Sequence, residues 1–248
     1  MRKALLALVI AALVGLNAYQ WVLRTRPPSD QDTINRFQAL FVGCQTLLKS
    51  TWLGVQAIQH PFDAWVTQEI FWEVKPEVVV ETGTLYGGSA LLWATIMEQI
   101  VPDHRVVTID VNEAPKLAIA RAHPLWQRHV EFLKGSSTAP NIVAEVEKRA
   151  KGKRVIVILD ALHTKDHVLA ELRAYAPLVP VGSYVIVQDT HLGDQIPHWY
   201  MAAADWWTPG PLKAVEEFLA TNKDFEVDAS RERFMATNNH RGFLKRVR

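Results

Sequence analysis

The sequence predicts an α/β fold in which a mostly parallel sheet is covered by helices on both faces. Four strand–helix units follow one another between residues 77 and 189, and their strands are continuous apolar runs. Such runs are typical of strands that are buried on both sides. The 248 residues suffice for one domain with a sizeable core, and 49% of them are hydrophobic, an ordinary share for a globular protein.

The N-terminal segment is the outlier in composition. Residues 4–23 carry no charge, and about 20 residues at 1.5 Å each would span a bilayer. Tyr19 and Trp21 stand where interfacial aromatic residues are found. A cleaved signal peptide is the rival interpretation, but residues 15–18 make a poor cleavage site. We therefore expect an N-terminal transmembrane helix, with residues 1–26 as a membrane anchor or signal segment.

Residues 27–66 are expected to form a linker and an N-terminal helical cap before the main domain, residues 67–248. The linker is polar and contains two consecutive prolines. Apolar residues then recur at helical spacing over residues 34–48. After an irregular stretch, Asp63 is placed to cap a helix over residues 64–74.

Strands and helices alternate in the main domain. The expected strands cover residues 77–81, 105–110, 130–136, 154–160 and 182–189. The helices between them are expected at residues 89–100, 114–124, 141–150 and 164–179, the second of them closed by Pro124. A loop of about 20 residues, longer than an ordinary connection, leads to a helix at residues 211–222 and a terminal pair of strands.

Acidic residues stand at the ends of four of the five strands. The carboxyl ends of parallel strands meet at one edge of a sheet, where ligands bind. The third strand ends in a glycine and Ser136 instead. The four acids are Glu81, Asp110, Asp160 and Asp189. We therefore expect an acidic rim around a ligand site.

The glycine-rich turn at residues 81–89 joins a strand to a helix, as in nucleotide-type sites, but it does not read G-x-G-x-x-G. Glu81 beside this turn would repel a pyrophosphate and suits a cationic ligand. Asp110 follows Gly88 by about 22 residues, where an acid binds ribose hydroxyls. S-adenosylmethionine carries a sulfonium, an amino group and a ribose but no phosphate. The turn therefore favours S-adenosylmethionine over NAD, and a purely structural glycine turn is the alternative.

The chain resembles class I methyltransferases, and within them the family named for cephalosporin hydroxylases and rhamnosyl O-methyltransferases. The most specific matching segments are "LYGGSA" at residues 85–90 and "LDALHTKDHV" at residues 159–168, and the matching pieces cover about residues 51–246. The resemblance implies a Rossmann-like sheet with an antiparallel last strand, S-adenosyl-L-methionine as the methyl donor and, in several members, a divalent metal such as Mg²⁺.

The predicted donor site combines the turn with two strand ends. The glycines and Ser89 shape the turn, Glu81 faces the amino end of the donor, and Asp110 binds its ribose. Two serines after the third strand are expected near the adenine. The predicted donor-binding residues are Glu81, Gly83, Thr84, Gly87, Ser89, Asp110, Ser136 and Ser137.

Two acids on one rim also suit Mg²⁺, which prefers oxygen ligands and would lower the pKa of a substrate hydroxyl. The resemblance implies metal binding by Asp160, Gln188 and Asp189, although the family has an acid where Gln188 stands, so that one negative charge is lost. Alternatively, Asp160 caps a helix and Asp189 is a loop acid.

Histidines near these acids are candidate proton acceptors. His163 follows Asp160 by three residues, where related metal-dependent methyltransferases have a lysine, and we predict it as the catalytic base together with Asp160. A hydrogen-bonding role at the helix start is the alternative. His167 is expected to pack on its helix, and His191 to be a further ligand or part of the loop. Aromatic loop residues, Trp206 and Trp207 among them, would wall the substrate pocket or hold the loop down.

These observations predict an S-adenosylmethionine-dependent O-methyltransferase that acts on a hydroxyl of a small-molecule or glycosyl acceptor. The alternatives are a catalytically inactive, membrane-tethered binding protein on this fold, which Gln188 favours, and an NAD-dependent oxidoreductase. The formal net charge of +1 argues against a nucleic-acid partner.

The expected location follows from the donor. Because the methyl donor is made in the cytosol, we expect a single-pass anchor with the catalytic domain facing the cytoplasm. The single cysteine, Cys44, forms no internal disulfide. The oligomeric state is left open, a homo-oligomer included.

Overall fold

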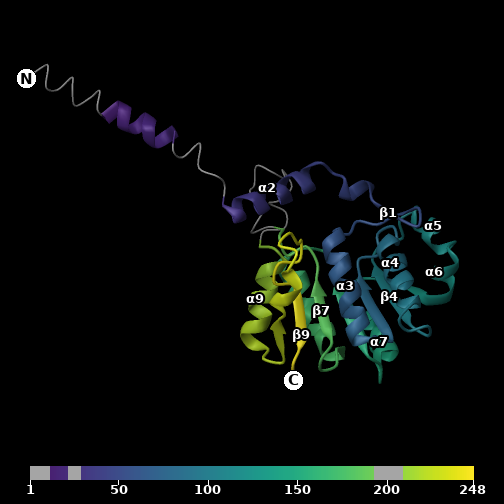
Figure 1. The fold of residues 1–248 in the computed structure, drawn as a ribbon. Helices are drawn as coiled ribbons and strands as arrows, with labels where there is room; N and C mark the ends of the chain where they lie inside the picture. Colours follow the sequence, from purple (N-terminus) through teal and green to yellow (C-terminus); the bar gives the residue numbers. More distant parts are fainter. Residues whose placement is uncertain (1–11, 22–28, 193–208) are drawn as a thin grey trace, which may run out of the picture. The chain divides into compact units, whose positions relative to one another are not determined.

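The computed structural model in Figure 1 describes residues 12–21, 29–192 and 209–248. The chain forms two compact units, residues 1–38 and residues 39–248. A helical segment at residues 12–21 belongs to the first unit. The helix α2 (Asp30–Gly43) begins in the first unit and ends in the second. All the strands in the described residues belong to the second unit.

The prediction of a transmembrane helix at residues 4–23 is wrong. In the parts of the chain that the structure describes, no helix has both the length and the apolar character needed to cross a bilayer. Residues 4–11 and 22–23 lie outside the described residues, and the helical segment at 12–21 has a rise of about 15 Å, half of a hydrocarbon core. The expected single-pass anchor with a cytoplasm-facing domain is overturned by the same finding.

A seven-stranded sheet in the order β5-β4-β3-β6-β7-β9-β8 forms the centre of the second unit. Its strands are β3 (Val78–Thr82), β4 (Arg105–Asp110), β5 (Val130–Lys134), β6 (Val155–Leu159), β7 (Tyr184–Val187), β8 (Phe225–Val227) and β9 (Phe243–Arg246). Strands β3 to β7 are parallel, and β9 is antiparallel to both β7 and β8. The predicted α/β fold with its mostly parallel sheet is therefore confirmed, as is the antiparallel last strand.

Helices cover both faces of this sheet because its strands are apolar on both sides. Val79 of β3 belongs to a core with one set of helices, whereas Val78 and Val80 belong to a core with the other, as the alternation of side chains along a strand requires. The first set is α3 (Pro61–Val74), α4 (Gly88–Glu98), α5 (Leu117–Arg121) and α6 (Pro124–His129). The second set is α7 (Pro140–Ala150), α8 (Lys165–Tyr175) and α9 (Pro211–Thr221).

Short elements complete the second unit. The strands β1 (Thr51–Trp52) and β2 (Val55–Gln56) form a hairpin. Its two turn residues, Leu53 and Gly54, both have positive φ angles, 49° and 81°, as tight hairpins require. The 3₁₀ helices are η1 (Leu47–Lys49), η2 (Ala176–Leu178) and η4 (Ala229–Glu232).

Two local predictions differ from the structure. Pro124 begins α6 instead of closing the preceding helix, because its fixed φ suits a first helical turn. Asp63 does not cap α3, which begins at Pro61. Its carboxylate instead accepts hydrogen bonds from the Thr237 hydroxyl and, at 2.8 Å, from the backbone N–H of Asn238. Asp63 therefore binds residues more than 170 positions away in the sequence instead of capping its own helix.

Candidate active site

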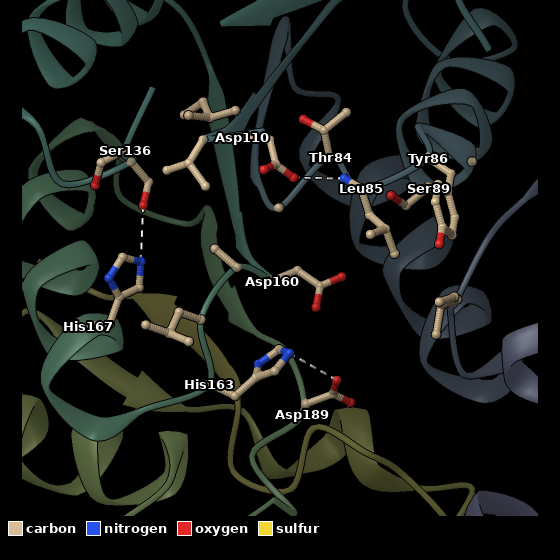
Figure 2. Close-up of a pocket in the computed structure, with 18 of the residues that line it drawn as sticks. Thr84, Leu85, Tyr86, Ser89, Asp110, Ser136, Asp160, His163, His167 and Asp189 are labelled. Atoms are coloured by element: carbon tan, nitrogen blue, oxygen red, sulfur yellow. Dashed lines mark hydrogen bonds and ion pairs between the residues drawn. The ribbon is translucent and has the colours of Figure 1, made fainter. Parts of the chain in front are cut away.

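A cavity of about 630 Å³ lies at the carboxyl ends of the parallel strands. Its walls come from the turn after β3 and from the ends of β4, β5, β6 and β7 (Figure 2). From β3 the sheet continues through β4 in one direction and through β6 in the other, so the cavity lies at the switch point where α/β sheets bind ligands. Its volume is in the range of small-molecule sites.

The glycine turn is held by close backbone contacts. Gly83 has a φ of 89°, and a Cβ there would lie 1.9 Å from the carbonyl oxygen of Asp160. A Cβ on Gly88 would lie 2.1 Å from the carbonyl oxygen of Gln56. Gly87, with a φ of 81°, is the N-cap of α4. Glycine at positions 83 and 88 therefore lets three chain segments meet at the cavity without steric clash.

Asp110 connects this turn to the end of β4. Its Oδ2 accepts a hydrogen bond of 2.9 Å from the backbone N–H of Leu85, and its Oδ1 accepts one of 2.9 Å from that of Asn112 (Figure 2). Leu85 has a positive φ of 46°, a conformation that this hydrogen bond stabilises. Because each carboxylate oxygen has two acceptor sites, Asp110 retains capacity for a ligand in the cavity that it lines.

Glu81 has a different environment from the one expected. Its side chain is fully buried and is not part of the cavity wall. The carboxylate accepts hydrogen bonds from Nε1 of Trp93 at 2.8 Å and from Oγ1 of Thr108 at 2.7 Å, and burial raises its pKa to about 7. The hydroxyls of Thr84 and Thr108 are 2.7 Å apart. Glu81 thus supports the turn from inside the core.

The serines after β5 form part of the opposite wall. The Ser137 hydroxyl donates to Oε1 of buried Glu171 at 2.5 Å and lies 3.2 Å from Nε2 of His167. The hydrogen bond with Glu171 raises the pKa of His167. The hydroxyl of Ser136 is 3.1 Å from that of Thr138. His167, expected only to pack on its helix, therefore also lines the cavity.

Three titratable side chains meet on one side of the cavity. Asp160, His163 and Asp189 each place one oxygen or nitrogen atom within 4.8 Å of the others, and Nε2 of His163 lies 3.6 Å from Oδ2 of Asp189 (Figure 2). Burial, and then the neighbouring carboxylates of Asp189 and Glu81, hold the pKa of Asp160 well above its usual range. Two carboxylates and an imidazole are a donor set that a divalent cation can use.

Gln188 contacts a residue that the sequence did not indicate. Its Nε2 donates to Oε1 of Gln59 at 3.3 Å, and Nε2 of Gln59 donates to Oδ2 of Asp160 at 2.9 Å. Gln188 therefore reaches Asp160 through Gln59, and its role as a metal ligand stays a prediction. Gln59 was not among the predicted site residues, because nothing in the local sequence around it indicates a contact with Asp160.

His191 lies close to Asp189. Its Nδ1 lies 3.0 Å from the carbonyl oxygen of Asn238 and 3.7 Å from Oδ1 of Asp189, and burial lowers its pKa. Trp206 and Trp207 lie outside the described residues.

Comparisons of the sequence identify relatives along most of the chain. The family model "Rhamnosyl O-methyltransferase/CmcI" matches residues 44–247. Rhamnosyl O-methyltransferases of Mycobacterium bovis (strain BCG / Pasteur 1173P2) and Mycobacterium tuberculosis (strain ATCC 25618 / H37Rv) are 33% identical to the chain over 223 residues, which cover 88% of this chain and 86% of theirs. The rhamnosyl O-methyltransferase of Mycobacterium leprae (strain TN) is 32% identical over 202 residues, 79% of this chain and 83% of that protein.

Solved structures share the fold. An apo structure of CmcI has a TM-score of 0.58 at 20% identity and covers 81% of this chain and 77% of that chain. A structure of CmcI with Mg and SAM has a TM-score of 0.56 at 20% identity and covers 81% and 78%. At this identity the likeness concerns the arrangement of helices and strands alone.

Proposed function

The chain belongs to the rhamnosyl O-methyltransferase/CmcI family of S-adenosylmethionine-dependent O-methyltransferases, and on this premise we propose which residues bind the donor and which act on the acceptor hydroxyl. The observation that carries the proposal is that a single cavity has the glycine turn with Asp110 in its walls together with Asp160, His163 and Asp189. The groups proposed to bind the donor and to accept the proton therefore line the same cavity.

The donor is proposed to lie along the turn after β3. Asp110 accepts hydrogen bonds from the ribose hydroxyls, because its carboxylate lines the cavity with acceptor sites to spare. Gly83, Gly87 and Ser89 shape the turn, and Ser136 and Ser137 lie at the adenine end. Glu81 fixes the turn through Trp93 and Thr108.

Asp160 and Asp189 are proposed to hold a Mg²⁺ ion. The cation would lower the pKa of the acceptor hydroxyl. Mg²⁺ keeps several waters in its coordination sphere, so two carboxylates suffice and the imidazole of His163 stays available to accept a proton. The raised pKa of Asp160 supports this, because part of its cause is the repulsion of neighbouring carboxylates, which a cation would relieve.

His163 is proposed as the base. The acceptor oxygen attacks the methyl carbon, the bond from that carbon to sulfur breaks with its electron pair remaining on sulfur, and the hydroxyl proton passes to His163. Asp189, 3.6 Å from Nε2 of His163, stabilises the imidazolium that results. Gln59 holds the carboxylate of Asp160 beside them.

A glycosyl hydroxyl, such as that of a rhamnosyl group, is proposed as the acceptor. The support is the name of the relatives that are 33% identical over 88% of this chain. Methyl transfer to a rhamnoside, but not to a non-glycosyl alcohol of similar size, is the expected outcome with the full chain and labelled donor. Equal transfer to both would contradict this assignment of the acceptor.

Asp189→Asn tests the proposed roles of Asp160, His163 and Asp189 in metal binding and proton transfer. We expect methyl transfer to fall by about 100-fold or more, the usual contribution of an acid–base group. Donor affinity, measured by calorimetric titration, should change less than about threefold, because the donor groups are untouched. Asp166→Asn, an exposed acid at the start of α8, is the matched control. Full activity in Asp189→Asn would contradict the proposed mechanism. If the parent binds the donor but transfers no methyl group, the chain is instead an inactive binding protein.

A further inference from the structure

A second cluster of potential metal ligands lies at the other end of the sheet. Glu98 is the last residue of α4, His104 precedes β4, and His129 is the last residue of α6. We name these three residues the histidine cluster. It lies at the amino-terminal end of β4, whereas the active-site cavity lies at the carboxyl end of that strand, roughly 17 Å away for a strand of this length. In Figure 1 these elements lie together on one side of the domain.

The two imidazole rings are held in one orientation. They are stacked, with centroids 4.2 Å apart and an interplanar angle of 12°. Nδ1 of His104 is 2.8 Å from the carbonyl oxygen of Val101, and Nδ1 of His129 is 3.3 Å from that of His104. Because a carbonyl oxygen only accepts, Nδ1 is the nitrogen that donates in each ring, which leaves Nε2 as the nitrogen that could bind a metal. Histidines that bind metals commonly donate their other N–H to a backbone carbonyl in this way.

The two Nε2 atoms lack hydrogen bonds. Among the described residues neither of them has a hydrogen-bond partner, although both are buried. Nε2 of His129 lies 2.7 Å from Oε2 of Glu98, but without the alignment of a hydrogen bond. Leaving buried polar atoms unsatisfied destabilises a fold. One ligand atom of each of the three side chains lies within 4.8 Å of the other two.

Two arginines lie beside the histidine cluster. Arg128 donates to Oε1 of Glu98 at 3.1 Å, which orients the carboxylate and leaves Oε2 toward the histidines. The guanidinium of Arg105 donates to the carbonyl oxygen of Arg128.

We propose that Glu98, His104 and His129 bind one transition-metal ion, with Zn²⁺ as the best match. Two imidazole nitrogens and one carboxylate oxygen are a common three-residue set for Zn²⁺, with water as the fourth ligand. The partial exposure of Glu98, 31%, gives that water access. The bound ion would join the end of α4 to the start of β4 and to the end of α6. This site offers two imidazole nitrogens and one carboxylate, whereas the cluster in the cavity offers two carboxylates and one imidazole.

The test uses the full chain carrying Asp160→Asn, which weakens the other candidate metal site. We expect about one equivalent of Zn²⁺ by calorimetry, an increase in Tm on adding Zn²⁺, and visible absorption bands from tetrahedral Co²⁺. Adding Glu98→Gln or His129→Gln should lower Zn²⁺ affinity by at least about 100-fold, because even outer-shell changes cost 10–100-fold. Glu145→Gln, which removes a carboxylate paired with lysine and arginine on α7, should leave Zn²⁺ affinity unchanged.

Two results would overturn the proposal. The first is a folded parent that binds no Zn²⁺. The second is equal Zn²⁺ affinity in Glu98→Gln and Glu145→Gln, with the fold of both verified by circular dichroism. Substitution of His104 could prevent folding, because that side chain is buried. Glu98 is partly exposed, so Glu98→Gln should fold and still test the site. Donor affinity measured on the same variants should not change, which separates this inference from the proposed function.

Discussion

The glycine turn after β3 and the acids that follow β6 and β7 line the same cavity but are held in place by different forces. The turn depends on close backbone approach, since a Cβ on Gly83 would lie 1.9 Å from the carbonyl oxygen of Asp160. On the acid side the carboxylates interact with one another, since burial and then the charges of Asp189 and Glu81 raise the pKa of Asp160. The turn should therefore be sensitive to added atoms, and the acid side to changes of charge that leave its shape intact.

The largest effect is expected from Gly83→Ala, which tests the steric side of this comparison. A non-glycine residue at positive φ costs about 1–2 kcal/mol, and overpacking adds about 1–3 kcal/mol. We expect the free energy of unfolding, measured by urea denaturation, to fall by about 3 kcal/mol or more.

Gly152→Ala separates the two contributions. Gly152 also has a positive φ, 73°, but no atom lies within 4 Å of the position that a Cβ would take there. Only the backbone cost of about 1–2 kcal/mol should appear in this variant. Equal losses in the two variants would show that close approach at Gly83 does not matter.

Asp110→Asn sharpens the comparison by changing charge on the turn side. The amide replaces one of two acceptor oxygens, so a hydrogen bond to Leu85 or Asn112 is lost together with the negative charge. Hydrogen bonds to charged groups contribute about 1.5–3 kcal/mol, and we expect donor affinity to fall by about 10–100-fold in calorimetric titration. Asp166→Asn again is the control. Unchanged affinity in Asp110→Asn would remove this residue from the donor site.

Glu81→Gln tests whether the buried acid beneath the turn acts through its charge. Burial raises the pKa of Glu81 from its ordinary value of 4.5 to about 7 in the folded protein, so the folded state binds more protons than the unfolded state between these pH values. The stability that this group contributes is present below pH 4.5 and is lost as pH rises through about 7, by up to about 1.4 kcal/mol per pH unit.

Urea denaturation at about pH 5, 6, 7 and 8 measures this dependence. The free energy of unfolding of the parent should fall relative to Glu81→Gln as pH rises to about 7 and then level off. Glu226→Gln, at an exposed position of β8, should run parallel to the parent. A constant difference between the parent and Glu81→Gln would contradict the raised pKa.

The order of strands and helices was predictable because local patterns determine it. Apolar runs such as residues 154–160 produced buried strands, and the glycine turn marked the start of α4. The rule that parallel strands end at one edge was enough to place Asp110, Asp160 and Asp189 around one cavity. Local composition also misled the prediction of a membrane span. Residues 4–23 carry no charge, but no helix among the described residues is long and apolar enough to cross a bilayer.

The tertiary structure alone decided which side chains contact one another across long stretches of sequence. Gln59 binds Asp160 from 101 positions away, and His167 meets Ser137 across 30. No periodicity encodes such pairs, because hydrogen bonds depend on positions within a few tenths of an ångström. The sequence by itself thus determined the succession of strands and helices, the mostly parallel sheet, the meeting of Asp110, Asp160 and Asp189 at one edge, and the family. Packing determined that Glu81 lies inside the core, that Gln188 binds Gln59, and that Glu98, His104 and His129 meet at the far end of the sheet.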